Sequence, residues 1–164
     1  MTATATPAAA GFTALQKSLH WAVVLLLVFQ YFLFDAMGRL FHTLMDTGAM
    51  PWTVTSVAHV VIGSAVLLLA LARIVLRLRD GVPPPPVAEP APFRTLSKLA
   101  HWAIYALLIL IPLSGLVAWF GQVGAAAGAH ETMTTLLQII VVLHIAAVIV
   151  HQVWWKTNLL SRMT

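Results

Sequence analysis

Four long runs of apolar residues dominate the chain, separated by short polar or Pro-rich segments. The runs cover about residues 19–34, 54–78, 99–120 and 132–155. Each is close to the ~20 residues that a helix needs to cross ~30 Å of hydrocarbon at ~1.5 Å per residue. Lipid offers an exposed backbone no hydrogen-bond partners, so runs of this length are expected to be membrane-spanning helices. The pattern predicts an all-α protein, a four-helix transmembrane bundle with an up-down-up-down arrangement.

The segments around these runs complete the expected domain organisation. Residues 1–14 are rich in Ala and Thr, carry no positive charge and are expected to form a disordered lead. Residues 15–164 form one membrane domain, with spans at about residues 15–36, 53–78, 96–120 and 130–155. The linker 79–95 contains four consecutive prolines and is expected to be extended. The connections at 36–51 and 121–129 are expected to be short loops, the second one small and flexible.

Lysine and arginine are unevenly distributed between the two sides of such a bundle. Of the nine basic residues, only Arg39 falls on one side, and eight fall on the other: Lys17, Arg73, Arg77, Arg79, Arg94, Lys98, Lys156 and Arg162. Membrane proteins keep such basic flanks in the cytoplasm, so both termini and the Pro-rich linker are expected there. The positive charges flank apolar runs, which argues for the lipid bilayer as partner and against nucleic acid.

Composition narrows the fold class and the possible cofactors. Only 9% of the 164 residues are charged and 60% are hydrophobic, too few charges to cover a water-facing surface. Cysteine is absent, which excludes iron–sulfur clusters, thiolate metal sites and covalently attached c-type haem.

Histidine is the residue type that points to function. His42 lies in the first outer loop, but six of the seven histidines lie in or at the edges of the predicted spans: His20, His59, His101, His130, His144 and His151. Ionisable groups inside a membrane are costly and usually functional. The spans contain almost no carboxylates with which these histidines could pair. Ligation of haem iron by neutral imidazoles therefore explains them better than a carboxylate-based proton or cation path.

Helical spacing sorts these histidines into two levels. His130 and His144 are 14 residues apart, which places them within ~40° of one helix face and ~21 Å apart. His151 is only ~10.5 Å beyond His144, too close for each to hold its own haem. His20 lies near the cytoplasmic surface and is predicted to join His144 on the iron of an inner haem b. His59 lies near the outer surface and is predicted to join His130 on the iron of an outer haem b.

Four further residues have open roles. His101 occupies the same level as His20 and could replace it as a ligand, and the depth of His151 leaves the same possibility for that residue. Otherwise both are expected to lie beside the inner haem or its substrate. Arg73 and Arg77, one helical turn apart, either approach the propionates of the inner haem or form a positive membrane flank. A haem-free transporter that uses its histidines for protons or metal is the alternative from another class.

Several short motifs run in a fixed order along the chain. They are Leu-Gln-x-Ser-x-His-Trp at 15–21, Arg-x-x-x-Arg-Leu at 73–78, Ile-Pro-Leu-Ser-Gly-Leu at 111–116, His-Glu-Thr at 130–132, Leu-His at 143–144 and Trp-Lys-Thr-Asn-Leu-Leu at 155–160. With these motifs the chain resembles the bacterial cytochrome b561 family of small four-helix dihaem proteins. The resemblance covers nearly the whole chain after residue 14.

The resemblance implies a location, cofactors and an activity. It implies a multi-pass protein of the bacterial inner membrane in which two haems b are ligated at His20, His59, His130 and His144. It also implies electron exchange with ubiquinone, in some members by oxidation of superoxide at the periplasmic surface, and a quinone or proton-handling role for His151. We therefore expect an oxidoreductase that transfers electrons between an outer donor, superoxide among the candidates, and ubiquinone, with no separate catalytic residue assigned. An electron-relay subunit of a partner dehydrogenase or hydrogenase is the alternative.

Overall fold

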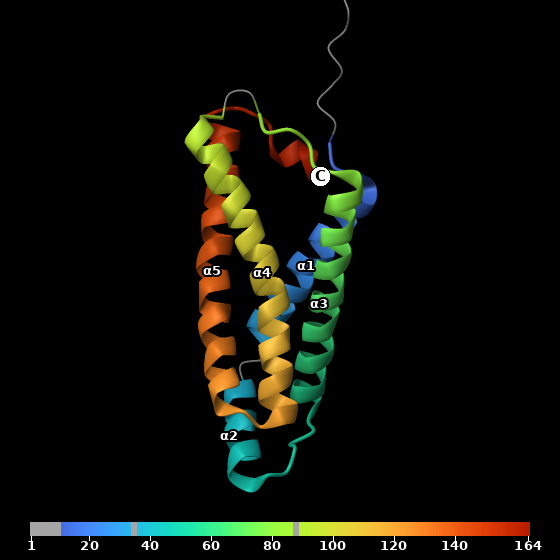
Figure 1. Cartoon of the computed structure of the whole chain (residues 1–164), viewed down its shortest axis with the longest axis vertical. Coiled ribbons are helices and arrows are strands. Elements are labelled where there is room, and N and C mark those ends of the chain that lie inside the picture. Colours follow the sequence, from blue (N-terminus) through green and yellow to red (C-terminus); the bar gives the residue numbers. More distant parts are fainter. Residues whose placement is uncertain (1–10, 34–35, 87–88) are drawn as a thin grey trace, which may run out of the picture.

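The described part of the chain is entirely helical in the computed structural model, which covers residues 11–33, 36–86 and 89–164 (Figure 1). Its elements are α1 (Ala14–Leu33), α2 (Met37–Thr47), α3 (Val54–Asp80), α4 (Ala91–Gly121), α5 (Gly124–Val153) and a 3-10 turn at Leu160–Arg162. The all-α prediction is confirmed. Four helices, α1, α3, α4 and α5, are long and apolar enough to cross a membrane. Most of the expected disordered lead, residues 1–10, lies outside the described residues.

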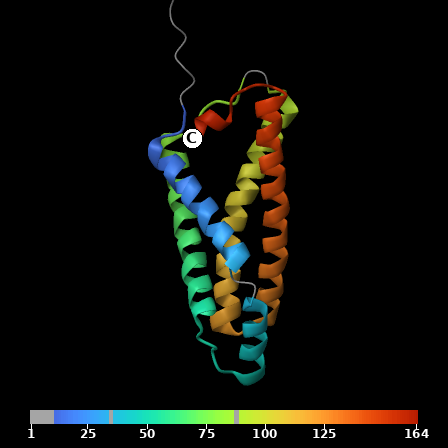
Figure 2. The same cartoon turned by 180° about the vertical axis from the view of Figure 1, so that it is seen from behind.

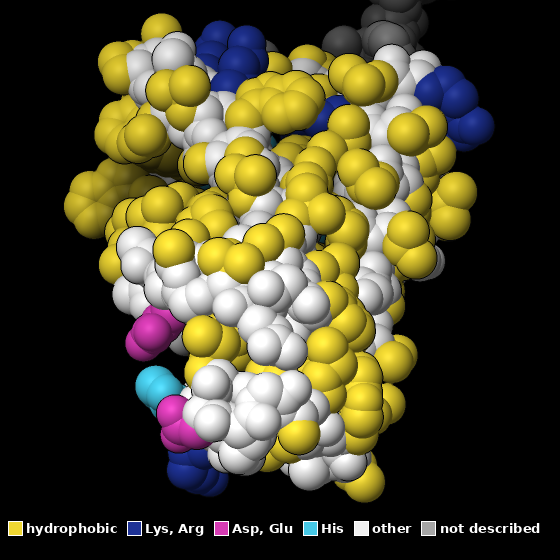
Figure 3. All heavy atoms as spheres, turned by 60° about the horizontal axis from the view of Figure 1, so that its bottom comes forward, with side chains coloured by type: hydrophobic (Ala, Val, Ile, Leu, Met, Phe, Trp, Pro, Cys, Tyr) yellow, Lys and Arg dark blue, Asp and Glu magenta, His cyan; other side chains and the backbone are white. Residues whose placement is uncertain are grey.

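Large apolar side chains cover the outside of these four helices. Val54 of α3 is 86% exposed and Val142 of α5 is 64% exposed, and many others on all four helices are exposed as well. Figure 3 shows hydrophobic side chains over most of the visible face, with only a few charged ones among them. Water-soluble proteins rarely expose apolar patches of more than a few hundred Å². The chain is therefore a multi-pass membrane protein whose apolar surface faces lipid.

Helix α3 packs against both α1 and α4, and α4 packs along α5. The far end of α1 reaches α5, where Tyr31 Oη donates to the Thr134 carbonyl at 3.1 Å. One end of the molecule, here called the linker end, holds the start of α1, the Pro-rich segment and the C-terminus (Figures 1 and 2). There Gln16 Nε2 donates to the Gly81 carbonyl at 3.2 Å, and Trp21 Nε1 donates to the Met163 carbonyl at 2.8 Å. The opposite end, here called the α2 end, holds α2 and the short α4–α5 turn.

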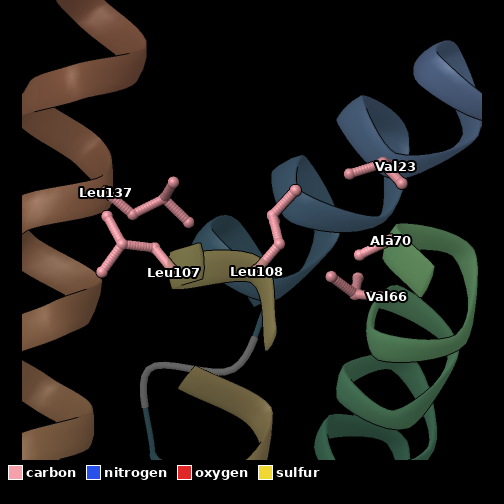
Figure 4. Close-up of a cluster of buried hydrophobic side chains, with 6 residues drawn as sticks. All are labelled: Val23, Val66, Ala70, Leu107, Leu108 and Leu137. Carbon is pink, nitrogen blue, oxygen red and sulfur yellow. The ribbon is translucent and has the colours of Figure 1, made fainter. Parts of the chain in front are cut away.

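A cluster of buried apolar side chains fills the middle of the bundle (Figure 4). It is formed by Val23, Val66, Ala70, Leu107, Leu108 and Leu137 and takes residues from all four long helices. Leu137 lies seven residues from both His130 and His144, and Val66 lies seven residues after His59. Seven residues correspond to ~10 Å along a helix. The cluster therefore separates one level of histidines from the other.

All three connections differ from the expected ones. The linker predicted over 79–95 is shorter, because α3 continues to Asp80 and α4 begins at Ala91. Residues 37–47 form α2, whose apolar Leu40, Phe41 and Leu44 recur at helical spacing and whose Leu44 is fully buried. Gly48, at φ 68°, ends α2 with its N–H donated to the Leu44 carbonyl at 2.9 Å. α5 begins at Gly124, because the Ala-rich residues that follow favour helix over an open loop.

Candidate functional site

His59 and His130 face each other near the α2 end of the bundle. His59 lies in the second turn of α3 and His130 in the second turn of α5, and their ring centres are 6.2 Å apart at an interplanar angle of 60°. Two imidazoles that share one metal ion through bonds of about 2 Å have ring centres roughly 6 Å apart. The spacing of this pair therefore fits two ligands of one metal ion.

A hydrogen bond to α4 fixes which nitrogen of His130 is available. His130 Nδ1 lies 2.8 Å from the carbonyl oxygen of Ile111. A carbonyl only accepts, so Nδ1 carries the proton and Nε2 keeps its lone pair. Histidines that bind a metal ion through one ring nitrogen generally donate the N–H of the other nitrogen to such an acceptor. The tautomer of His130 is therefore that of a ligand.

Gly115 of α4 makes the position of His130 possible. A Cβ at Gly115 would lie 2.9 Å from His130 Nδ1 and 3.0 Å from its Cε1, closer than such contacts occur. This role of Gly115 was not predicted from the sequence. Residue spacing within one helix does not show which residues of α4 contact α5. On the neighbouring side, Gln30 Nε2 donates to the His59 carbonyl at 2.9 Å and fills the space beside Gly63.

Three histidines gather on the other side of the central cluster, toward the linker end. The rings of His101 and His144 are in contact, with centres 5.3 Å apart and an interplanar angle of 88°. His101 Nδ1 donates to the Ser97 carbonyl at 2.6 Å, which leaves its Nε2 with the lone pair. His20 stacks edge-on against Trp21 and interacts electrostatically with both other histidines. The structure thus brings together the two predicted inner ligands, His20 and His144, and one of the two alternatives, His101, but not the other alternative, His151.

Arg73 and Arg77 border this second level from α3. Arg77 lies 5.5 Å from the Trp102 ring centre, and both guanidinium groups lie 5.9 Å from the Tyr105 ring centre. Arg73 also donates to the Gln16 carbonyl at 3.2 Å. Both arginines interact electrostatically with His101. Two positive charges are therefore held beside the histidines by packing on aromatic faces.

His151 lies apart from both levels and uses both of its ring nitrogens. Its Nδ1 is 3.0 Å from Thr157 Oγ1 and its Nε2 is 3.6 Å from Glu89 Oε1. The expectation that the histidines lack carboxylate partners is therefore wrong for His151. Glu89 could not be identified from the sequence, since helical spacing does not specify where a Pro-rich linker folds. With Nδ1 in contact with Thr157 and Nε2 facing Glu89, His151 is poorly placed to bind a haem iron.

The donor set also distinguishes between kinds of metal centre. Among the residues that the structure describes, no group of three or more His, Cys, Asp or Glu side chains is arranged to enclose a metal ion. Facing imidazoles without further protein donors suit an iron whose remaining ligands come from a macrocycle. The residues present therefore fit haem better than a metal ion held by protein alone.

Comparisons with known proteins agree with this chemistry. A family model described as prokaryotic cytochrome b561 matches residues 11–164. The chain is 33% identical over 153 residues to cytochrome b562 of Cereibacter sphaeroides, covering 93% of this chain and 94% of the relative. It is 27% identical over 174 residues to a probable superoxide oxidase, CybB, of Yersinia pestis, again with 93% and 94% covered. With its four apolar helices it is a multi-pass bacterial membrane protein, and it belongs to the prokaryotic cytochrome b561 family.

Proposed function

We propose that the protein is a dihaem b-type cytochrome that transfers electrons from a donor at the α2 end to ubiquinone at the linker end. Membership of the cytochrome b561 family implies that it binds haem b. The observation that carries the proposal is the presence of facing imidazoles on both sides of the central apolar cluster. Two such levels provide a site for electron entry near one membrane surface and a site for exit near the other.

The proposed orientation places the linker end in the cytoplasm and the α2 end outside, in the bacterial inner membrane. Arg73, Arg77, Arg94 and Lys98 belong to the linker-end turns of α3 and α4, and Lys17 begins α1 there. Cytoplasmic flanks of membrane helices carry this excess of basic residues. The four long helices would then run up-down-up-down, with both termini on the cytoplasmic side.

The outer haem is assigned to His59 and His130. Their ring spacing supports this pairing, as does the hydrogen bond that keeps the lone pair on His130 Nε2. His59 belongs to α3 and His130 to α5, so the two proposed ligands come from different helices.

The inner haem is assigned to His20 and His144, with His101 as the alternative to His20. His101 and His144 stand on α4 and α5, which pack directly against each other, and their rings already touch. Packed helices lie with axes only about 8–10 Å apart, which leaves little room for a macrocycle between facing side chains. His20 stands on α1, which is not closely packed on α5 within the described residues. The helix arrangement therefore favours His20.

The residues of this chain would control the chemistry of the bound cofactor. Haem iron, when bound, supplies one-electron transfer by alternating between its ferric and ferrous states. His20, His59, His130 and His144 would fix its axial ligation, and the apolar cluster would exclude water between the two levels. Arg73 and Arg77 would hold the propionates of the inner haem, because guanidinium groups bind carboxylates strongly where water is scarce.

Superoxide is the proposed donor, with a relay subunit of a dehydrogenase or hydrogenase as the rival. The similarity to the probable superoxide oxidase of Yersinia pestis over 93% of this chain supports the first candidate. The outer side offers only Arg39 as a fixed positive charge to attract an anion. A relay subunit would instead receive electrons from a protein docked at the same end.

The absorption spectrum of the purified protein tests the cofactor assignment. A reducible b-type spectrum with about two haems per chain is expected, and its absence would favour the haem-free transporter. His20→Ala and His101→Ala then separate the two candidate ligands. We expect His20→Ala to lose one haem and His101→Ala to keep both. The reverse result would assign the inner haem to His101 and His144.

Rapid mixing tests the electron donor and acceptor. Oxidised protein in liposomes is mixed with superoxide in the presence and absence of a short-chain ubiquinone, and haem reduction is followed optically. Fast reduction by superoxide, followed by reoxidation only when quinone is present, is expected. If superoxide reduces the protein slowly and a dehydrogenase copurifies with it, the relay function is the correct one.

A further inference from the structure

Glu89 and His151 form a buried ionisable pair at the linker end that no haem site uses. Their side chains are only 4% and 8% exposed, and Glu89 Oε1 lies 3.6 Å from His151 Nε2. Trp155 packs edge-on against the His151 ring with centres 4.6 Å apart, and Phe93 in turn packs against Trp155. Burying a carboxylate and an imidazole costs free energy, and ionisable groups buried in membrane proteins are usually functional.

The hydrogen bonds around His151 locate its exchangeable proton. Thr157 Oγ1 donates its one hydrogen to the His151 carbonyl at 3.2 Å. The same oxygen, 3.0 Å from His151 Nδ1, must then accept, so Nδ1 carries a proton. The nitrogen that gains or loses a proton is therefore Nε2, which faces Glu89. Nε2 lies 3.6 Å from Glu89 Oε1, which is the distance of an ion pair when the imidazole is protonated.

Other charged groups near the pair come from α4 and the C-terminal segment. Arg94 Nε donates to the Glu89 backbone carbonyl at 2.8 Å, and Glu89 interacts electrostatically with His101. Arg162 donates to the Pro84 carbonyl of the same linker at 2.7 Å, and Lys156 is exposed beyond Trp155. His151 itself follows His144 on α5 by seven residues, or ~10.5 Å. The pair thus lies between water at the linker end and the inner histidine level.

We propose that Glu89 positions and recharges His151 as the proton donor for quinone reduction at the linker end. The inference rests on the proposed function. A quinone becomes a quinol by taking up two electrons and two protons, and the electrons arrive from the outer donor. Each proton leaves His151 Nε2 for a quinone oxygen, and the pair regains a proton from water on the linker side through Glu89. The Pro-rich linker therefore contributes Glu89 to the proposed quinone-reducing site, in addition to connecting α3 and α4.

The test compares Glu89→Gln with Asp80→Asn in the full-length, haem-loaded protein. Asp80 lies at the same end and pairs at the surface with Arg79, so it controls for the loss of a carboxylate. The reduced proteins are mixed with a short-chain ubiquinone between about pH 5 and 8, the range in which histidine ordinarily titrates. Glu89→Gln removes the group through which the pair regains a proton from water, so proton supply to the quinone should become limiting sooner as the pH rises.

We expect the quinone-dependent reoxidation of Glu89→Gln to decline with rising pH at a lower pH than in the wild type. At neutral pH the rate should fall at least tenfold, while haem content stays unchanged. Asp80→Asn should match the wild type. Thr157→Val, which removes the acceptor of Nδ1–H, should shift the profile in the same direction and provides a second variant if Glu89→Gln fails to fold.

Two outcomes separate this inference from the proposed function. If the wild type reduces quinone and both variants show its unshifted pH profile, the role of Glu89 is wrong and the electron-transfer function stands. If the reduced wild-type protein is not reoxidised by quinone at any pH, the proposed quinone acceptor is wrong and this inference is overturned with it.

Discussion

Gly115 of α4 and the imidazole of His130 on α5 are packed so closely that a methyl group at residue 115 would lie 2.9 Å from Nδ1. The same imidazole donates to the carbonyl of Ile111, one helical turn earlier on α4. The surface of α4 thus sets both the position and the tautomer of His130. A small residue here controls the geometry of a proposed haem ligand from a neighbouring helix.

Replacing Gly115 with alanine is expected to displace His130 and remove or weaken the outer haem. The added Cβ meets the ring edge and would break the hydrogen bond to Ile111, so His130 would lose its fixed orientation. The pyridine haemochrome assay should then give about one haem per chain instead of about two, or the spectrum should show a fraction of high-spin haem.

Gly128→Ala is the matched control for this substitution. Gly128 is also helical, two residues before His130, but a Cβ there would meet nothing within 4 Å. Alanine is favoured over glycine in a helix by about 1 kcal/mol, so this variant should keep both haems. If Gly115→Ala also keeps two low-spin haems, the close packing of Gly115 against His130 is not needed for haem binding.

Neutralising Arg73 or Arg77 is expected to lower the midpoint potential of the inner haem. A positive charge near a haem stabilises the reduced form, which carries one more negative charge, so Arg73→Gln and Arg77→Gln favour the oxidised form. A tenfold change in the ratio of ferrous to ferric haem corresponds to about 59 mV for one electron. Potentiometric titration followed at the haem α-band measures the shift.

Arg79→Gln is the control on the same helix. Its guanidinium group lies at the surface and pairs with Asp80 at 2.6 Å. Both haem potentials of this variant should match the wild type. Equal shifts in all three arginine variants would mean that the effect is one of general surface charge and not of binding to propionates.

His151→Ala is expected to keep both haems and to slow the reduction of quinone. Nδ1 of His151 contacts Thr157 and Nε2 faces Glu89, so both ring nitrogens point toward protein groups at the linker end and not toward a proposed haem. Haem content and the low-spin signals in electron paramagnetic resonance check the first expectation, and quinone-dependent reoxidation checks the second. Loss of a haem would make His151 a ligand in place of His20 or His144.

Thr53→Ala is expected to destabilise the start of α3. Thr53 caps this helix: its Oγ1 accepts from the Ser56 N–H at 3.1 Å, and Ser56 Oγ accepts from the Thr53 N–H at 2.8 Å. Loss of such a cap costs about 1 kcal/mol. Thermal unfolding in detergent should show a lower midpoint, and the outer haem should dissociate first because His59 lies six residues further on. Simultaneous loss of both haems from this variant would contradict the expectation that the outer haem dissociates first.

The main features of the fold follow from short-range patterns that a sequence displays directly. The four apolar runs predict the four candidate spans, since span length is set by hydrocarbon thickness. The 14-residue interval on α5 predicts that His130 and His144 lie on one face at different depths, because both belong to one rigid helix. The level of a residue in the membrane is thus readable from its own helix.

Relationships between helices could not be predicted in the same way. The contact of Gly115 with His130 depends on the rotation of α4 against α5, and the burial of Glu89 depends on the path of a linker. Helix α2 was missed because its 11 residues are too few to form a membrane span. The choice between His20 and His101 likewise depends on the spacing of helices and not on depth.

The central apolar cluster has an electrical consequence. It lies between the two histidine levels, which are ~21 Å apart in a layer of ~30 Å. An electron that moves inward between these levels crosses roughly two thirds of the membrane voltage. Carrying one charge across 100 mV involves about 2.3 kcal/mol, so this step would involve roughly 1.5 kcal/mol. Turnover of the protein should therefore generate a current and should slow as the inside of the cell becomes more negative.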